Sequence, residues 1–190
     1  NAVSGSTAAL QIAFKSVSFT SNKNALSLSN RGATTNPWTI TFVDCEFIEN
    51  TKGAFAWEDT QGRPLVLEMT NTLFRKNGDL TGNSALNFII LGAVDWKMNG
   101  ASFYENSGLN GGAAALSISS SSDSKLTWDS VIFENNKAGP GGNGGAVSII
   151  GASTTSNKVD WQMNNCQVKA NSADAGNGGA FSLDHPSNAV

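Results

Sequence analysis

The element Phe-x-x-Asn recurs along this chain at a nearly constant interval. Five copies are complete and begin at Phe19, Phe47, Phe74, Phe103 and Phe133. A sixth copy has Val168 in place of Phe and keeps the Asn. Units that recur every 27 to 35 residues are too small to bury an apolar face alone, so they have to stack on one another. The repeat therefore predicts a solenoid.

An alternating stretch precedes each copy of the element. Apolar residues fall in two columns separated by mostly polar residues, and this period of two predicts a strand with one buried face. The first column is Ile12, Ile40, Leu67, Trp96, Leu126 and Trp161. The second column is Phe14, Phe42, Met69, Met98, Trp128 and Met163. No part of the chain shows the apolar period of an amphipathic helix.

Small or polar residues follow these strands and predict a turn, because such residues tolerate or stabilise a left-handed backbone. They are Ser16, Asp44, Asn71, Gly100, Ser130 and Asn165. A short second strand then carries the Phe column. A third strand, with the pattern Ala, apolar, small, apolar, is expected at residues 25–28, 54–57, 85–88, 115–118, 146–149 and 180–183.

Three short strands in each repeat predict an all-β fold, a single-stranded parallel β-helix of about six coils whose strands lie about 4.8 Å apart. We expect residues 1–190 to form a single β-helix domain. Its coils are expected near residues 6–28, 38–57, 65–90, 94–118, 124–150 and 159–183. Because the chain begins at Asn1 without a methionine, we expect it to be part of a longer chain or an assembly.

Phe-x-x-Asn combined with Gly-Gly-Ala and an apolar residue resembles the repeat of the chlamydial polymorphic outer-membrane proteins. The resemblance covers nearly the whole chain and is clearest where residues 133–136 precede residues 144–147. The first two repeats depart from it, since neither has the Gly pair. The resemblance implies a right-handed parallel β-helix in a secreted or surface-displayed protein. Proteins of that family act as adhesins, so the resemblance also implies an adhesive role.

The Asn of each repeat is expected to stack on the Asn of the next at one corner of the β-helix. We refer to this column as the Asn ladder, and its members are Asn22, Asn50, Asn77, Asn106, Asn136 and Asn171. An amide can donate to the next coil and also satisfy the backbone of the turn. A structural role follows from the repeat alone, so we favour it over ligand binding.

Charge and composition weigh against several kinds of partner. The chain has 12 basic and 15 acidic residues and no basic run, so we do not expect it to bind nucleic acid, which requires phosphate neutralisation. No apolar run is long enough for a transmembrane segment.

Cys45 and Cys166 occupy equivalent positions about four coils apart, too far for a disulfide, and we expect two buried free thiols. No Cys and His spacing for zinc is present, and we expect no metal or cofactor.

Catalytic residues are not evident, and we do not expect an enzyme. Asp95 and Asp160 share an outward position two coils apart, but Lys125 lies between them and favours an ion-pair ladder over a catalytic pair. The only histidine, His185, is expected at the surface. All five Trp fall in inward columns, which favours a core role over a sugar platform, and Trp38 is the one that we expect to be most exposed.

The third strands are expected to present a flat outer face of short side chains, suited to close approach by another surface. A simple solvated strand is the alternative. This putative docking face comprises Ala25, Ser27, Ala54, Ala56, Ala85, Asn87, Ala115, Ser117, Ala146, Ser148, Ala180 and Ser182.

These features together predict an extracellular structural or adhesive β-helix protein, which acts as a stiff surface or filament element through its outer faces and corner loops. The expected partners are other copies of the chain or a larger parent chain, joined head to tail or laterally, and a host surface or polysaccharide is a further possible ligand. The alternative is a carbohydrate-active β-helix, similar to a polysaccharide lyase or hydrolase, or a carbohydrate-binding module.

Overall fold

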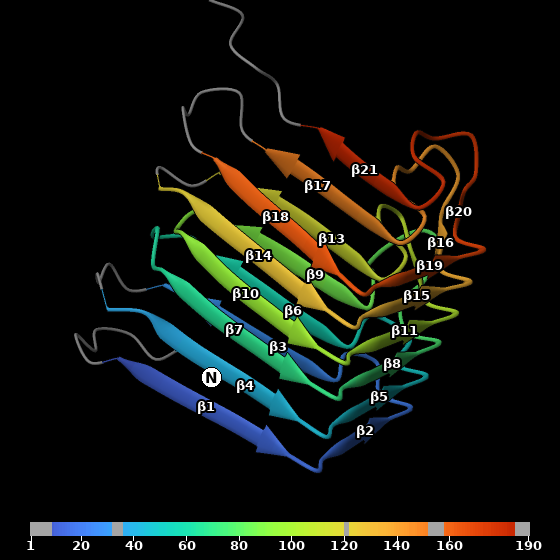
Figure 1. The fold of residues 1–190 in the computed structure, drawn as a ribbon. Helices are drawn as coiled ribbons and strands as arrows, with labels where there is room; N and C mark the ends of the chain where they lie inside the picture. The colour runs from blue at the N-terminus through green and yellow to red at the C-terminus, as the bar shows by residue number, and fades with distance from the viewer. Residues whose placement is uncertain (1–8, 32–35, 120–121, 152–157, 185–190) are drawn as a thin grey trace, which may run out of the picture.

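The computed structural model describes residues 9–31, 36–119, 122–151 and 158–184. These residues contain strands and turns and no helix. Parallel strands stack into a β-helix that winds in a right-handed sense from β1 to β21 (Figure 1). The predicted all-β fold class and the parallel β-helix are confirmed.

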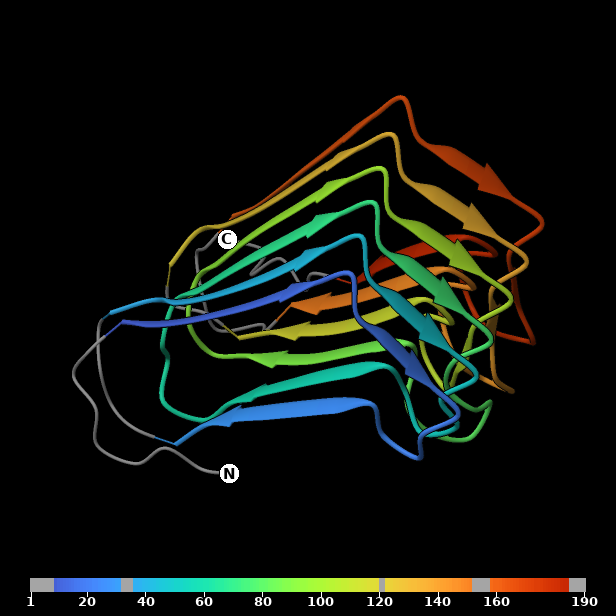
Figure 2. The same ribbon diagram turned by 90° about the horizontal axis from the view of Figure 1, so that it is seen from below.

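Three six-stranded parallel sheets form the sides of the β-helix. Sheet A contains β1 (Leu10–Lys15), β4 (Trp38–Val43), β7 (Leu65–Thr70), β10 (Val94–Asn99), β14 (Ser124–Asp129) and β18 (Val159–Asn164). Sheet B contains β2 (Ser18–Thr20), β5 (Glu46–Ile48), β8 (Leu73–Arg75), β11 (Ser102–Tyr104), β15 (Ile132–Glu134) and β19 (Gln167–Lys169). Sheet C contains β3 (Leu26–Asn30), β6 (Phe55–Asp59), β9 (Leu86–Ile90), β13 (Ala114–Ile118), β17 (Val147–Gly151) and β21 (Phe181–Asp184). Sheets A and C form the two long sides, and sheet B forms a short third side that follows sheet A (Figure 2).

A small fourth sheet, sheet D, lies at the corner between sheets B and C. It contains only β12 (Ser107–Gly108), β16 (Lys137–Ala138) and β20 (Ser172–Ala173), so it belongs to the last three coils. This corner widens along the chain. Two residues separate Asn22 from Ala25 in the first coil, and eight separate Asn171 from Ala180 in the last.

The predicted register of sheets A and B agrees with the observed pairing of the strands. Ile12 lies beside Ile40 and Phe14 beside Phe42, and the Phe residues of neighbouring repeats pair across sheet B. Neighbouring Phe rings stack almost parallel with centroids 4.7 to 5.0 Å apart. That separation matches the spacing of parallel strands, so the backbone repeat itself places the rings in stacking contact.

Each coil has two corners with a left-handed backbone. The first falls at the predicted turn residues, where φ lies between 47° and 67°. The second was not predicted and falls on the residue before each Asn of the ladder, where φ lies between 52° and 57°. Its members are Ser21, Glu49, Lys76, Glu105, Asn135 and Ala170.

The predicted register of sheet C is wrong in the fourth coil. Ala115 lies beside Asn87 and Ser148, and Leu116 beside Phe88 and Ile149. The equivalent of Ala85 is therefore Ala113, and the prediction was displaced by two residues. Three consecutive alanines, residues 113–115, allow both alignments to satisfy the pattern of small and apolar residues.

Candidate functional site

The Asn ladder runs without interruption through all six coils. Asn77 illustrates the geometry, because its backbone N and its Nδ2 both donate to Oδ1 of Asn106, at 2.9 and 3.0 Å. Its Nδ2 also donates to the backbone oxygen of Phe47 at 2.8 Å. The four central members, Asn50, Asn77, Asn106 and Asn136, have no exposed surface. The ladder therefore satisfies the buried polar groups of one corner, and its four central members offer no free surface to a ligand.

A second, shorter row of Asn residues lies at the Gly-Gly turn before sheet C. The backbone N of Asn143 donates to Oδ1 of Asn110 at 3.1 Å, and the backbone N of Asn177 donates to Oδ1 of Asn143 at 2.8 Å. These bonds run from later coils to earlier ones, which is opposite to the direction in the Asn ladder. The recurring Asn-Gly-Gly sequence at Asn110, Asn143 and Asn177 is the signal for this row in the sequence.

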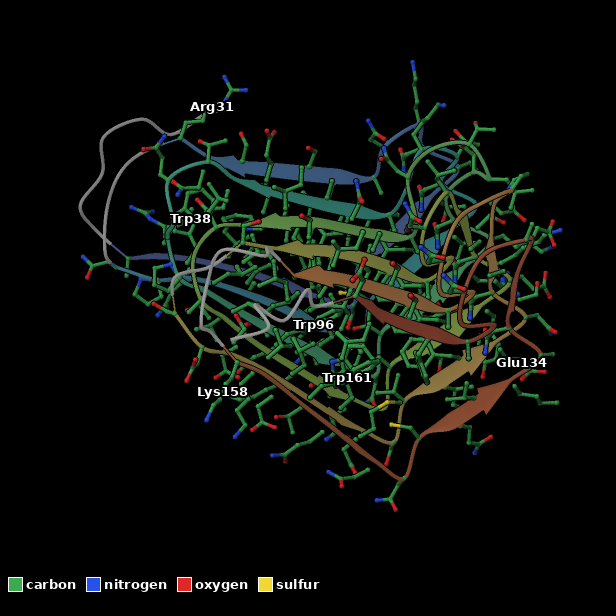
Figure 3. The ribbon with its side chains drawn as sticks, turned by 90° about the horizontal axis from the view of Figure 1, so that it is seen from above. Arg31, Trp38, Trp96, Glu134, Lys158 and Trp161 are labelled. Carbon is green, nitrogen blue, oxygen red and sulfur yellow. The ribbon has the colours of Figure 1, made fainter. Side chains whose placement is uncertain are left out.

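Ion pairs join neighbouring coils around the corner where sheet B ends. Lys52 contacts Asp79 at 3.2 Å, and Lys137 contacts Asp174 at 2.8 Å. Lys169 contacts Glu134 at 3.1 Å, and Glu134 lies at the outer rim of the β-helix (Figure 3). All of these pairs are solvent-exposed, so each contributes little to stability. Their shared direction along the axis means that they connect coils and do not converge on one centre.

The carboxylates of sheet A are held by neighbouring side chains. Nζ of Lys97 lies 3.2 Å from Asp95 and 3.7 Å from Glu68. The hydrogen bond to Asp95 and its negative charge raise the pKa of the Lys97 ammonium, so Lys97 stays protonated at neutral pH. Asp160 accepts hydrogen bonds from Gln162. The predicted ladder through Lys125 is therefore wrong in its partners, although the three residues lie in the expected register.

A shallow groove of about 340 Å³ crosses the outer face of sheet A, and apolar atoms make up most of its lining. Its polar lining residues are Glu68, Thr70, Lys97, Asn99, Thr127 and Asp129. The hydroxyl of Thr127 is covered, yet it has no hydrogen-bond partner among the described residues. The groove thus combines carboxylates, an ammonium group and amide or hydroxyl groups on one rigid sheet.

The predicted docking face is only partly correct. Ala54, Ala85 and Ala146 have no exposed surface, because they lie at the turn before each strand, where the alternation of inward and outward residues is broken. The observed row of sheet C that faces away from the core is Ser27, Ala56, Asn87, Ala115, Ser148 and Ser182. Ser148 is nevertheless only 2% exposed, so its predicted place on a docking face is wrong. The neighbouring row contains Ser117 but also Glu58, Ile89 and Ile150, and the two Ile are 47% and 41% exposed. The face is therefore neither uniformly small nor free of charge.

The Trp side chains belong to the core. Trp38, Trp57, Trp96 and Trp128 are at most 4% exposed, and Trp161 packs against the core in the last coil. Figure 3 shows Trp96 and Trp161 inside the β-helix. Ring edges meet ring faces, as between Trp96 and Trp128 with centroids 5.1 Å apart. Trp38, for which the greatest exposure was predicted, instead packs against Trp57 and lies beneath the guanidinium of Arg63.

Both cysteines are free thiols. Cys45 is fully buried, whereas Cys166 is partly exposed because it lies in the last coil.

The described residues contain no group of Cys, His, Asp or Glu arranged to hold a metal ion. They also include no helix long and apolar enough to cross a bilayer. His185 lies outside the described residues.

Comparisons of the chain with protein-family models, with curated proteins and with solved structures find no match.

Proposed function

We propose that this protein is an extracellular structural or adhesive β-helix, a stiff element of a surface or filament that meets its partners through its outer faces and corner loops. The observation that carries this proposal is the uninterrupted Asn ladder. It couples each coil to both of its neighbours through buried hydrogen bonds, so that the stack behaves as one body.

The same residues that make the fold regular also make it stiff. An Asn side chain in the ladder cannot move without breaking bonds to the coils before and after it, for example those of Asn106 to Phe74 and to Asn136. Breaking such bonds in a buried site carries the full cost of leaving polar groups unsatisfied. The resemblance of the repeat to that of the chlamydial polymorphic outer-membrane proteins supports the extracellular and adhesive part of the proposal.

Hydrogen exchange of the native protein, measured together with catalytic assays, tests this function. We expect the backbone amides of Asn50, Asn77 and Asn106 to exchange at similar, very slow rates, because opening one coil disturbs its neighbours. We also expect no turnover of a panel of acidic and neutral polysaccharides. Turnover of any of these polysaccharides would contradict a purely structural role.

The groove on sheet A favours carbohydrate binding as a second candidate function. Its carboxylates, the ammonium group of Lys97 and the exposed amide of Asn99 are groups that hydrogen-bond sugar hydroxyls. Glu68 and Asp129 lie two coils apart along the axis and two residues apart along the strands, or about 12 Å in total, which is wider than an inverting carboxylate pair. Titration calorimetry with oligosaccharides distinguishes the candidates, since Asn99→Ala should weaken binding in the groove, and Ser117→Val on sheet C should not.

A further inference from the structure

Three neighbouring strands in the middle of sheet A share a row of outward polar side chains. Thr70 of β7, Asn99 of β10 and Asp129 of β14 lie at equivalent positions, each beside the next. Because these strands are adjacent in the sheet (Figure 1), the row runs along the axis of the β-helix and crosses the strands. We call these three residues the polar row, and all three line the groove on sheet A.

The polar row offers groups that the protein itself does not use. The amide of Asn99 is exposed, and neither this amide nor the hydroxyl of Thr70 has a hydrogen-bond partner among the described residues. The carboxylate of Asp129 accepts hydrogen bonds from Asn165 and Ser130, both at 3.1 Å, which hold it in place. Asp129 forms no ion pair within the part of the chain that the structure describes, so its charge is available to a cation.

The groove carries an excess of negative charge. Its lining includes the carboxylates of Glu68 and Asp129 and a single ammonium group, that of Lys97. Lys97 lies 3.7 Å from Glu68 and 3.2 Å from Asp95, so these two carboxylates already offset its charge. The charge of Asp129 is not offset in this way. A ligand that complements the groove therefore brings a cationic group to Asp129.

The lining and the period of the groove fit a chain of sugar rings. Apolar atoms make up most of the lining, so the apolar C–H faces of sugar rings can pack there while a few polar groups fix their orientation. The polar row repeats once in each coil, with a spacing of about 4.8 Å. A linear β-1,4-linked polysaccharide advances by nearly the same distance per sugar. A polysaccharide aligned with the axis can therefore place one sugar at each residue of the polar row.

We propose that this groove binds a linear β-1,4-linked polysaccharide of amino sugars with free amino groups, aligned with the axis of the β-helix. The ammonium group of one sugar pairs with Asp129, and hydroxyl groups of its neighbours bond to Asn99 and Thr70. This inference deepens the proposed adhesive function by naming a ligand, and it rests on carbohydrate binding in the groove.

Titration calorimetry with oligomers of glucosamine tests the proposal, at a mildly acidic pH where their amino groups are protonated. We expect the affinity to rise up to the trimer, which spans the three coils of the groove, and to increase only slightly for longer oligomers. The fully N-acetylated trimer carries no charge. It should bind about fivefold more weakly than the glucosamine trimer, which is the loss expected for one exposed ion pair.

Replacing Asp129 by Asn tests the ion pair from the side of the protein. Asp129→Asn should weaken binding of the glucosamine trimer about fivefold, and should leave binding of the N-acetylated trimer unchanged. Glu46→Gln is the matched control, because Glu46 is exposed on sheet B and its replacement removes the same charge from a different face. We expect Glu46→Gln to bind both trimers like the wild type. Circular dichroism of each variant verifies that the β-helix is folded.

Three results would overturn the proposal. Equal affinities of the wild type for the two trimers would show that the groove does not recognise the amino group. Equal losses in Asp129→Asn and Glu46→Gln would show attraction to the net charge of the chain and not to the groove. Failure of every oligomer to bind would also refute carbohydrate binding in the groove, but would leave a structural role as a stiff element intact.

Discussion

Asn106 donates twice to the same atom of Asn136. Its backbone N lies 3.1 Å and its Nδ2 2.9 Å from Oδ1 of Asn136, and both residues are fully buried. Asn106 in turn accepts the same pair of bonds from Asn77. One side chain therefore satisfies donors and acceptors in three successive coils. This explains why the sixth repeat keeps its Asn, although Val168 replaces the Phe of that repeat.

Replacing Asn106 by Ala should lower the free energy of unfolding by about 1–3 kcal/mol. The substitution leaves the backbone N and the Nδ2 of Asn77 without an acceptor inside the protein, and a buried unsatisfied group costs that much. Thermal or denaturant unfolding measures the loss. Asn22→Ala is the control, since Asn22 is exposed in the first coil and its removal should change stability by less than about 0.5 kcal/mol. Equal effects at the two positions would refute the ladder as a stabilising element.

Gly142 should not tolerate a methyl group. A Cβ at this position would overlap the backbone carbonyl of Leu109 in the preceding coil, and strain of this kind in a packed site costs about 1–3 kcal/mol. Gly179→Ala is the matched control, because the nearest atom to its added Cβ is 3.7 Å away. Melting temperatures of the two variants should therefore differ clearly, and equal melting temperatures would contradict the close stacking of these turns.

The two thiols should differ in reactivity. Cys166 is partly exposed and Cys45 is not, so a thiol reagent should modify one cysteine in the native protein and both in denaturant. Cys166→Ser should abolish the native reaction, and Cys45→Ser should leave it unchanged. If neither cysteine reacted with the reagent in denaturant without a reductant, the two would form a disulfide. That result would contradict the observed separation of their coils.

Asp79 should make part of the stability dependent on pH. Hydrogen bonds from Thr81, with a further contribution from Lys52, lower the pKa of the Asp79 carboxyl below 3.8. A lowered pKa in the folded state stabilises the protein above the unfolded value, and this contribution is lost as the pH falls through the folded pKa. Asp79→Asn should therefore destabilise the protein at pH 6 but have a smaller effect below about pH 3.8. A difference between variant and wild type that did not change with pH would contradict this account.

The strand order and the register of sheets A and B could be predicted because large apolar residues mark every coil. Phe14, Phe42 and the Phe column have no alternative alignment within their repeats. The register of sheet C is harder to predict, because its pattern consists of an alanine beside small residues. Residues 113–115 match that pattern in two registers. The alternation of inward and outward residues also does not indicate that Ala54 and Ala85 lie at buried turns.

Two other features left no readable signal in the sequence. The second left-handed corner falls on Glu49, Lys76 and Glu105, which are not residues typical of a left-handed backbone. Position in the repeat determines their conformation, because the buried Asn that follows each of them fixes the turn. Lys97 lies closer to Asp95 than to Glu68 because of the rotamers of these side chains. The spacing of residues in the sequence does not determine those rotamers.

Cryo-electron microscopy of the purified native chain tests the central claim most directly. We expect stiff rods, alone or within a larger assembly, in which the strands of successive coils are spaced about 4.8 Å apart along one straight axis. Rods that bend between coils, or particles in which the coils separate from one another, would contradict the account.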